Sequence, residues 1–470
     1  MAGICRMGCQ GIRIVTHADE IEQILGRARQ LAANGENEPA KQVYVDALRI
    51  DPTHFSALNE LGILAYGSGH RSAARTVYSH AVLYHPSNPI GRVNLANILL
   101  EDGNIADAQM HYQAALAVDP DFPEAHQGLA RALTRLGDSA ADEHWQKGFV
   151  GHAVVSSRRR GVEPGVPLLL LNSARGGNIP MRYWFDDHRF AVTMIYADFY
   201  EPVHPLPPHV LIVNAIGDAD LCGAALAGAE QILARSTTPV INPPALVRPT
   251  ARADNVRRLA GVPGVIAPRI MSLPRAEVTA AGGLGFPLLL RALGFHTGQH
   301  FVYVEDYAAL ANAVTALPGD EVLAIEYLDA RGSDGMARKY RVMFVDGTLY
   351  PLHLAISADW KVHYFTAAMA TNAHYRDEER SFLEDMPAVL GQRAMTALAG
   401  ICAALGLDYA GVDFGLAPDG SVLLFEANAT MVVYPPDADP IWDYRRRAIT
   451  DVLDAVKRMM SCRAGMRDAC

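Results

Sequence analysis

Small and apolar residues return at a fixed spacing of thirty-four positions through the first third of the chain, with polar residues between them. Small residues let two antiparallel helices cross closely, a glycine supplies the positive φ that ends a first helix, and a proline stops the second. The pattern therefore predicts repeated helix pairs. The recurring columns are Ala28, Gly62, Ala96 and Ala130; Gly35, Gly69, Gly103 and Gly137; Ala40, Ala74 and Ala108; Tyr44, Tyr78 and Tyr112; Ala47, Ala81 and Ala115; and Pro52, Pro86 and Pro120.

This period, with its closing proline, resembles the tetratricopeptide repeat. The fourth copy has decayed, because Asp142 and Phe149 occupy small-residue positions and Val154 replaces the proline. A worn last copy is expected where a solenoid ends. The resemblance implies an all-α docking module over residues 21–150, after a leader of residues 1–20. A peptide or protein partner is expected in its concave groove, where Asn97 and Arg131 occupy equivalent positions of successive copies.

Beyond the repeats the pattern changes from helical to strand-like. A polar, basic stretch predicts a linker over residues 151–164, and short apolar runs then occupy residues 167–171, 190–196, 209–214 and 239–242. Such runs, alternating with helical stretches, indicate a buried and largely parallel sheet. We therefore expect an α/β domain over residues 165–245, whose strand order periodicity does not give.

The C-terminal half shows hairpins instead. Asp346-Gly347 and Pro418-Asp419-Gly420 each separate two strand-like runs, and helices are expected at residues 388–405 and 443–460. Antiparallel hairpins with helices indicate an α+β domain over residues 246–460, followed by a tail of residues 461–470. The predicted fold class is thus multidomain: an all-α solenoid, an α/β domain and an α+β domain.

Composition narrows the classes of partner. The chain has 470 residues, half of them hydrophobic, and a formal net charge of -10. This charge gives no electrostatic footprint for nucleic acid or for an anionic membrane surface. No signal-peptide core and no membrane-spanning run is apparent. A cytoplasmic protein without nucleic-acid or membrane partners is the expectation.

Candidate chemistry concentrates in the last hairpin. Alternation along a strand puts Val412, Phe414 and Leu416 on one face and Asp413 on the other, and separates Leu423, Phe425 and Ala427 from Glu426 and Asn428. If the apolar faces share a core, Asp413, Glu426 and Asn428 converge on the opposite side. A two-residue turn at Asp419-Gly420 would set Asp413 directly opposite Glu426, whereas an odd loop would break that register. An oxygen-only set suits magnesium; a solvated hairpin face is the alternative.

With its upstream context this hairpin resembles the ATP-grasp superfamily, which includes glutathione synthetases and ligases that add glutamate to a ribosomal protein. The resemblance covers about residues 166–460, and implies ATP and magnesium as cofactors, with Asp413, Glu426 and Asn428 as metal ligands. It further implies phosphate contacts from Arg291, His296 and Gly298, an adenine-reading segment at Glu326, Tyr327 and Leu328, and a strand bordering the phosphates with Lys339 and Arg341. Asp413-Phe414-Gly415 also spells a protein-kinase motif, but no glycine-rich loop or His-Arg-Asp triplet accompanies it.

Two positions depart from the superfamily's pattern. Arg291 stands where the superfamily usually has lysine, and it keeps the charge. Asp254 is followed by the uncharged Asn255 in place of another usual lysine, and Arg252, Arg257 and Arg258 are the candidates to supply the missing charge.

The resemblance implies an ATP-dependent ligase that joins a carboxylate to an amine through an acyl phosphate, with Arg291 and Arg341 as catalytic residues. Because Asp413 and Glu426 share a polar face, where an amide keeps the shape but holds magnesium poorly, Asp413→Asn and Glu426→Gln are each expected to abolish ligation with little loss of folding. The alternative is a nucleotide-binding scaffold without turnover, which Asn255 favours. The sequence does not name the acid or the amine.

Overall fold

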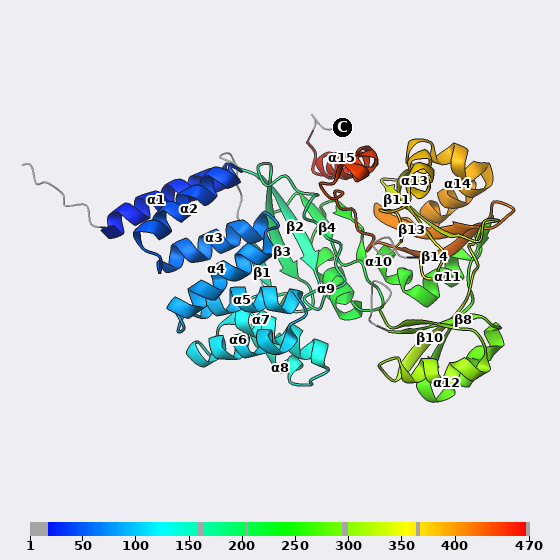
Figure 1. The fold of residues 1–470 in the computed structure, drawn as a ribbon, viewed down its shortest axis with the longest axis horizontal. Coiled ribbons are helices and arrows are strands. Elements are labelled where there is room, and N and C mark those ends of the chain that lie inside the picture. The colour runs from blue at the N-terminus through cyan, green and yellow to red at the C-terminus, as the bar shows by residue number, and fades with distance from the viewer. Residues whose placement is uncertain (1–16, 158–163, 204, 294–298, 363–366, 467–470) are drawn as a thin grey trace, which may run out of the picture. The chain divides into compact units, whose positions relative to one another are not determined.

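The computed structural model describes residues 17–157, 164–203, 205–293, 299–362 and 367–466. The chain divides into two compact units, residues 1–152 and 153–470 (Figure 1). Several sequence assignments lie outside the described residues: most of the leader, part of the linker, the end of the tail, and the loop that contains His296 and Gly298.

The first unit consists, in its described part, of four consecutive helix pairs. Each pair packs along the next, as the thirty-four-residue period predicts. The helices are α1 (His17–Ala33), α2 (Asn37–Ile50), α3 (Phe55–Gly67), α4 (Arg71–Tyr84), α5 (Pro89–Glu101), α6 (Ile105–Val118), α7 (Pro123–Leu136) and α8 (Ala141–Phe149).

The small-residue columns lie where the helices cross. Ala28, Ala96 and Ala130 have no exposed surface, and a Cβ atom on Gly62 would lie 2.4 Å from a ring carbon of Tyr78. The glycine column has positive φ in every copy, with values of 81°, 85°, 83° and 70° at Gly35, Gly69, Gly103 and Gly137. Helices α2, α4 and α6 end before the prolines. The predicted roles of these columns are confirmed.

Polar side chains connect successive helix pairs. These contacts are spread along the unit, and many join residues about one repeat apart. They include Arg29 to Glu60 (Nη2 to Oε1, 2.7 Å), Asn94 to Asn59 (Nδ2 to Oδ1, 2.7 Å), Tyr66 to Glu101 (Oη to Oε1, 2.5 Å) and Arg135 to the carbonyl oxygen of Leu100 (2.6 Å).

The second unit begins with a five-stranded sheet in the order β1-β3-β2-β4-β5. Strands β2 (Val166–Asn172), β3 (Phe190–Tyr196), β4 (Leu211–Asn214) and β5 (Val240–Ile241) are mutually parallel, as their apolar runs predict. Helix α9 (Gly223–Leu233) connects β4 to β5. The predicted linker is corrected in one part, because β1 (Val154–Ser156) pairs antiparallel with β3.

Two further sheets follow. A four-stranded antiparallel sheet has the order β7-β10-β8-β9, and a five-stranded sheet has the order β12-β11-β13-β14-β6. The smaller consists of β7 (Ile270–Pro274), β8 (Leu288–Ala292), β9 (Phe301–Val304) and β10 (Glu321–Glu326); the larger of β6 (Val265–Ile266), β11 (Ala337–Val345), β12 (Thr348–Ser357), β13 (Tyr409–Leu416) and β14 (Val422–Asn428). The predicted hairpins are β11–β12 and β13–β14.

Helices enclose the larger sheet. One face packs its apolar side chains, including Val412 and Phe414, against Leu398 and Ile401 of α14 (Met386–Leu405) in a common core. The other face is reached by α11 (Arg252–Leu259), and the two helices lie on opposite sides of the sheet in Figure 1. The remaining segments are η1 (Arg248–Thr250), α10 (Pro244–Val247), η2 (Arg275–Leu284), α12 (Tyr307–Thr315), α13 (Ala373–Glu384), η3 (Pro440–Arg445) and α15 (Arg446–Arg463), which extends into the predicted tail.

Helix α14 is the one helix of the described residues that is long and apolar enough to cross a membrane, judged by length and composition. Eight of its residues are buried in the structure, and Gly391 has non-helical φ and ψ of 78° and 165° within it. A buried core helix passes the same test, so this feature is weak evidence for a membrane span.

Candidate active site

The register of the β13–β14 hairpin decides which side chains meet. The loop between the strands has five residues, 417–421, and not the predicted two-residue turn. An odd loop alone would displace the register, but a β-bulge after Asp413 restores it, so Asp413 lies opposite Glu426. The predicted pairing is therefore present for a different reason.

The same bulge corrects the predicted faces of β14. Val422 and Leu424, and not Leu423 and Phe425, belong to the core with Val412 and Phe414. A Cβ atom on Gly415 would lie 3.1 Å from the ring of Phe425, which places Phe425 beside the face of Asp413. One inserted residue thus changes the face of each side chain on one side of the bulge.

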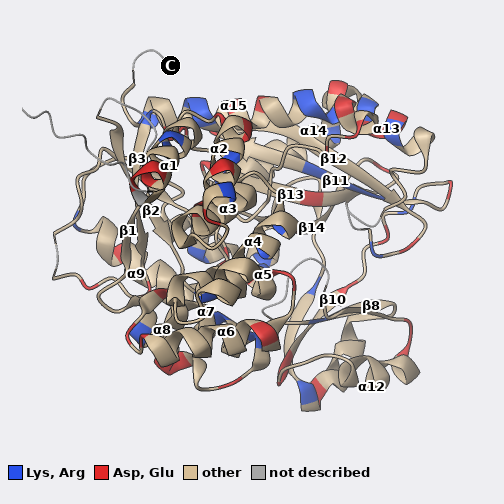
Figure 2. Cartoon of the chain, turned by 60° about the vertical axis from the view of Figure 1, so that its left-hand side comes forward, with Lys and Arg blue, Asp and Glu red and all other residues tan. Residues whose placement is uncertain are grey.

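A row of titratable residues crosses four strands of the larger sheet. His353 pairs with Arg341, Arg341 with Asp413, and Asp413 with Glu426. A second irregularity, between Arg341 and Val342, leaves Leu352 of β12 as an extra residue beside this row. Figure 2 shows basic positions on β11 next to an acidic position on β13. Bulges that flank a row in this way re-aim side chains and are common next to active sites.

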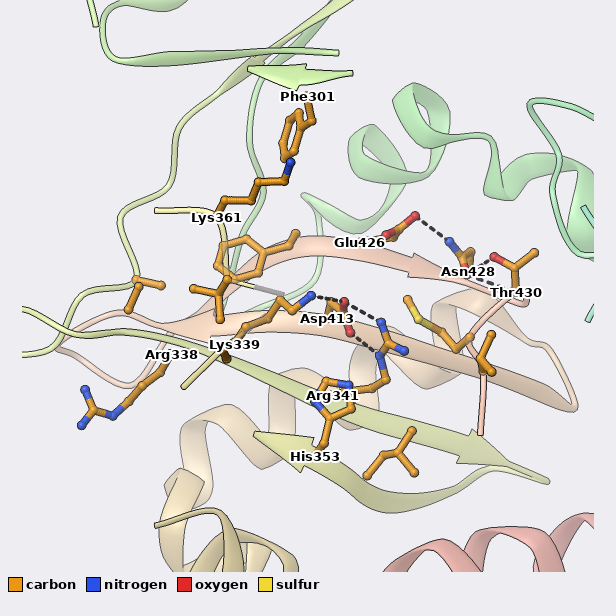
Figure 3. Close-up of a pocket in the computed structure, with 18 of the residues that line it drawn as sticks. Phe301, Arg338, Lys339, Arg341, His353, Lys361, Asp413, Glu426, Asn428 and Thr430 are labelled. Atoms are coloured by element: carbon orange, nitrogen blue, oxygen red, sulfur yellow. Dashed lines mark hydrogen bonds and ion pairs between the residues drawn. The ribbon is translucent and has the colours of Figure 1, made fainter. Parts of the chain in front are cut away.

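Asp413 is buried and bound by two cations of β11. Arg341 donates from Nε to Oδ1 at 2.6 Å and from Nη2 to Oδ2 at 2.8 Å, and Lys339 donates to Oδ2 at 3.1 Å (Figure 3). Burial by itself raises the pKa of Asp413, but the charges of Arg341 and Lys339 outweigh it and hold the pKa well below its ordinary value. Asp413 is therefore a carboxylate at neutral pH.

Glu426 is the centre of a second cluster. Its Oε1 accepts from Nη2 of Arg252 at 2.6 Å and from Nδ2 of Asn428 at 2.9 Å, and Oδ1 of Asn428 accepts from the hydroxyl of Thr430 at 2.9 Å. Burial raises the pKa of Glu426, but the charges of Arg252 and Arg291 lower it below its ordinary value. The three predicted metal ligands thus lie on one face, as the sequence predicts.

The arginines of helix α11 lie in different surroundings. Arg252 points to Glu426 with 16% of its side chain exposed, whereas Arg257 is 77% exposed and pairs with Asp254. Arg258 donates to the side chain of Asn255 at 3.1 Å. Asn255 is buried and donates to the carbonyl oxygen of Ala427, so it holds β14 against α11. Of these three arginines, Arg252 is the one that pairs with Glu426.

Two glycines flank Asp413 on the same face of β13. A Cβ atom on Gly415 would lie 2.5 Å from the side chain of Ala330, and one on Gly411 would lie 2.7 Å from Cγ of Met431. Each neighbour occupies the space that a side chain would need. Asp413 therefore stands between two segments that close in on the strand from either end.

Arg341, Asp413 and Glu426 line a cavity of about 940 Å³ in the second unit. Arg252, Arg291, Lys339 and Arg341 surround Asp413 and Glu426 in this cavity. Asp218 and Asp220 also lie close enough to act on Arg252 and Arg291. Although the whole chain has a net charge of -10, four cationic side chains are clustered in this part of the cavity. It suits an anionic ligand.

Residues of the smaller sheet line one end of the same cavity. Glu326 ends β10, Tyr327 and Leu328 follow it, and all three line the cavity. The carboxylate of Glu326 is engaged by Arg269 (Nε to Oε2, 3.1 Å). Asp329 is likewise paired with Arg331. Arg291 of β8 lies beneath Phe301 of β9, with its guanidinium carbon 5.7 Å from the ring centroid.

Sequence reasoning missed the aromatic side of this end. Trp360 stacks on Tyr303, with ring centroids 5.5 Å apart, and lies edge-on to Phe301 at 5.4 Å. Figure 3 shows Lys361 extending toward Phe301. The pair Trp360-Lys361, aromatic and basic between a hairpin and a helix, was a signal in the sequence that could have found this wall. His353 gave no such signal.

The donor atoms fit magnesium in part. No group of three or more His, Cys, Asp or Glu side chains in the described part of the chain is placed to hold a metal ion. The candidate set has two acids and an amide, and Oε2 of Glu426 accepts no hydrogen bond from the described residues. Both oxygens of Asp413 accept from cations. Oxygen donors suit magnesium, with Glu426 and Asn428 best placed and Asp413 shared with Arg341 and Lys339.

The residues predicted to contact a partner of the repeats are largely engaged within the first unit. Asn97 accepts from the hydroxyl of Tyr112 at 2.7 Å, and Nε of Arg131 donates to the carbonyl oxygen of Gln127 at 3.2 Å. Asn97 is half-buried and Arg131 is exposed. The guanidinium of Arg131 is the more accessible of the two.

Several known proteins resemble the chain over its repeats. A 32% identical stretch of 82 residues in a TPR repeat-containing thioredoxin, TTL4, of Arabidopsis thaliana covers 17% of this chain and 12% of that protein. A probable UDP-N-acetylglucosamine–peptide N-acetylglucosaminyltransferase, SPINDLY, of Hordeum vulgare is 30% identical over 100 residues, 21% of this chain and 11% of that protein. The chain thus spans about an eighth of the length of the curated relatives it matches.

Solved structures also superpose on the chain, loosely. A RimK domain protein ATP-grasp from Sphaerobacter thermophilus is 18% identical, covers 64% of this chain and 99% of its own, and has a TM-score of 0.38. MamA from Desulfovibrio magneticus RS-1 is 24% identical, covers 27% of this chain and 73% of its own, and has a TM-score of 0.25. At these TM-scores neither superposition defines a shared fold.

Family models identify the repeats directly. Two models described as tetratricopeptide repeat match residues 59–108 and 99–141. Both matches fall on the helix pairs whose glycine and alanine columns are described above. The repeats of the first unit are therefore tetratricopeptide repeats, a module that supports binding of a protein partner.

Proposed function

We propose that the second unit is an ATP-dependent carboxylate–amine ligase and that the repeats dock a peptide or protein partner. The observation that carries the proposal is the floor of the cavity, where Arg252, Arg291, Lys339 and Arg341 surround Asp413 and Glu426. Transfer of a γ-phosphoryl group requires charge neutralisation and in-line positioning more than covalent help from the protein. The clustered cations supply both.

In the proposed reaction a carboxylate oxygen attacks the γ-phosphorus of ATP. The bond from that phosphorus to the bridging oxygen breaks, ADP leaves, and an acyl phosphate forms. The amine nitrogen then attacks the acyl carbon, the carbon–oxygen bond to phosphate breaks, and phosphate leaves as the nitrogen loses a proton to solvent. Arg291 and Arg341 hold the outer phosphate oxygens, because a guanidinium donates to two oxygens at once.

Glu426, Asn428 and Asp413 would hold magnesium, which supplies further charge neutralisation to the phosphates when bound. In the described state Arg341 and Lys339 already neutralise Asp413. An incoming polyphosphate competes for these two cations, which frees oxygens of Asp413. Binding of the polyphosphate and binding of magnesium by Asp413 would thereby be coupled through Arg341.

The aromatic end suits the adenine ring. Phe301, Tyr327 and Trp360 line it, and β10 brings the backbone of residues 326–328 to the same wall. Aromatic faces stack with flat heterocycles, and a backbone segment supplies donors and acceptors. His296 and Gly298, which the resemblance assigns to a phosphate loop, stay predictions.

The test is nucleotide turnover with hydroxylamine as the amine. Hydroxylamine intercepts an acyl phosphate as a hydroxamate, so no natural acceptor is needed. We expect ADP and hydroxamate to appear together with at least one acid of a panel, and Arg341→Met to abolish both. Arg331→Met, a loop arginine paired with Asp329, is the matched control and should leave both products unchanged.

The second candidate function is a scaffold that binds nucleotide and does not turn it over. It is favoured by the ion pairs on both oxygens of Asp413, which leave that carboxylate neutralised without metal. A scaffold binds a non-hydrolysable ATP analogue and releases no ADP with any acid. Co-formation of ADP and hydroxamate rules it out.

Docking by the repeats is tested by the partner residues already named. In the full chain Arg131→Ala combined with Asn97→Ala should raise the KM for a peptide substrate while leaving that for ATP unchanged. Arg27→Ala, an exposed arginine of α1, is the control. Kinetics that the pair does not alter for any peptide would contradict the docking role of these two residues.

A further inference from the structure

The cavity has a second end, on the other side of Asp413 from the aromatic wall. Along β13, Gly415 faces Ala330, which lies beside the segment of residues 326–328, and Gly411 faces Met431. The second end is lined by Leu352, Met369, Met431, Val432, Trp442 and Ile449. Asp413 and Arg341 therefore separate two chemically different halves of one cavity.

This apolar end is assembled from distant segments. Leu352 is the extra residue at the β12 bulge, Met369 precedes α13, Met431 and Val432 follow β14, and Trp442 and Ile449 belong to η3 and α15. Leu352, Met369 and Met431 are each at most 5% exposed. The missing side chain of Gly411 leaves the space that Met431 occupies, so the wall is packed to the edge of the charged row.

The charged groups at this end are already compensated. Arg445 donates from Nε to the fully buried Glu379 at 3.0 Å, and its guanidinium carbon lies 4.0 Å from the ring centroid of Trp442. Burial, together with the charge of Arg341, holds the pKa of His353 well below its ordinary value, so this imidazole is neutral. Among the described residues that line this end, Asp437 is the one remaining carboxylate, and it is exposed at the rim.

We propose that the apolar end binds the body of the acid substrate, and that this acid has an uncharged, apolar body and no ammonium group beside its carboxylate. The proposal rests on the proposed ligase function. The carboxylate meets Arg341 at the charged row, and the alkyl or aromatic body contacts Met369, Met431 and Trp442. The carboxylate nearest to an α-ammonium group would be Asp413, which Arg341 and Lys339 already bind. The ammonium group would therefore be buried against methionine and leucine without an uncompensated carboxylate to pair with, which is costly.

The proposal separates two substrate classes that the same chemistry could use. An amino-acid donor requires an acid for its ammonium group, and an acidic amino acid also requires a base for its second carboxylate. The described wall offers neither in uncompensated form. A fatty or aryl-alkyl carboxylic acid requires only the Arg341 charge and apolar contact, and both are present. Methionines suit such a ligand, since they adapt to irregular apolar shapes.

The experiment is calorimetric titration of the full-length protein with matched acids. The pairs are hexanoate with norleucine and 3-phenylpropionate with phenylalanine, each differing by one ammonium group. Every acid is titrated with and without the non-hydrolysable analogue AMP-PNP and magnesium. We expect each acid without the ammonium group to bind at least about tenfold more tightly than its partner, because the unpaired ammonium is desolvated.

Variants locate the site. Met431→Gln keeps the length of the side chain and makes it polar, and should weaken hexanoate about tenfold without changing the affinity for AMP-PNP. Val432→Gln, on the same loop but half-buried, repeats the test if the first variant does not fold. Met110→Gln, on an exposed methionine of the repeats, is the control and should change neither affinity.

Each outcome bears on a different claim. Three outcomes would overturn the acid-site proposal. The amino acids could bind as tightly as their partners, or no acid could bind at all. Alternatively, the folded Met431→Gln and Val432→Gln proteins could bind hexanoate with unchanged affinity. If the wild-type protein shows the expected acid preference but does not bind AMP-PNP, the ligase function is overturned and the acid-site proposal is retained. Preference for the acids without an ammonium group, lost in the variants, supports both its place and its chemistry.

Discussion

The two units use polar side chains in opposite ways. In the repeats the polar contacts are distributed, so that Arg29 to Glu60 and Tyr66 to Glu101 each join neighbouring helix pairs at a separate place. In the second unit Arg341, Asp413 and Glu426 lie in a single row across neighbouring strands, with Asp413 buried at its centre. When contacts are distributed, the loss of one costs little free energy. When they form a single row, the loss of one residue also affects the interactions of its neighbours.

The two units also use glycine differently. A Cβ atom on Gly128 in α7 would lie 2.1 Å from the ring of Tyr112, so this glycine admits a core tyrosine. Gly411 and Gly415 instead admit Met431 and Ala330 on either side of a carboxylate. Absence of a side chain serves helix packing in one unit and the shape of a cavity in the other. The difference teaches that stability and function can be perturbed separately in this chain.

The largest effect is expected from Asp413→Asn. The amide cannot compensate Arg341 and Lys339, which are 19% and 15% exposed, so ligation should be abolished and the second unit destabilised by about 3–5 kcal/mol. The structure thus predicts a larger loss of folding than the sequence does. Turnover and urea unfolding measure both. Asp437→Asn at the rim is the control; a variant as stable as wild type would break the comparison.

The dependence of the second unit's stability on acidic pH is also expected to involve Asp413. Because the pKa of Asp413 is lowered in the folded state, its contribution is present above the ordinary aspartate pKa of about 3.9 and is lost as pH falls through the folded value. The stability difference between wild type and Asp413→Asn should therefore be constant near neutral pH and shrink below about pH 4. A difference that grows on acidification would contradict this sign.

A smaller effect is expected at Arg252. Arg252→Met should weaken AMP-PNP binding about 10- to 100-fold, because a charged hydrogen bond contributes about 1.5–3 kcal/mol. Arg257→Met, on the exposed side of the same helix, is the matched control and should bind as wild type does. Equal losses in the two variants would show that α11 contributes general positive charge and not a specific contact.

The glycines sharpen the comparison between the units. Gly128→Ala should destabilise the repeats by about 1–3 kcal/mol through overpacking against Tyr112, and leave AMP-PNP binding unchanged. Gly411→Ala should weaken hexanoate binding by displacing Met431. Far-UV circular dichroism during urea unfolding and calorimetry read the two effects. If Gly128→Ala weakens nucleotide binding, the units are not independent.

The smallest effect is expected from Tyr66→Phe. It removes the hydrogen bond to Glu101 on an exposed part of the repeats, where such bonds contribute about 0.5–1.5 kcal/mol at most. The shift in the urea midpoint should be slight, with the slope unchanged. Ile63→Ala, an exposed neighbour on the same helix, provides a comparison without a polar contact. A loss as large as that of Gly128→Ala would show that the contacts in the repeats act cooperatively.

Much of the fold could be predicted because its determinants are local. The period of Ala28, Gly35 and Pro52 specifies a helix pair within one copy, since crossing, positive φ and helix termination each depend on one residue type. The parallel strands at residues 166–172 and 190–196 follow from runs buried on both faces. Strand β1 was missed, because its three exposed residues have no apolar pattern and gain their structure from pairing with β3.

The site could be predicted in its residues but not in its geometry. Alternation along β13 and β14 placed Asp413, Glu426 and Asn428 on a common face. The loop of residues 417–421 and the bulge near Phe425, which offset each other, are set by the packing of neighbouring strands and leave no periodic signal. The core positions of Val422 and Leu424 were accordingly assigned to the wrong residues.

The sequence by itself determined which elements form and which residue types are available: the repeats, the strands, and the acids and bases of the hairpins. Only the tertiary structure decided that Arg252 pairs with Glu426 while Asn255 holds the backbone of Ala427, and that Leu352, Met431 and Trp442 line one cavity. The reason is physical. Periodicity reports which face of an element is buried, whereas a site depends on contacts between segments far apart in the chain, fixed by register, bulges and close packing.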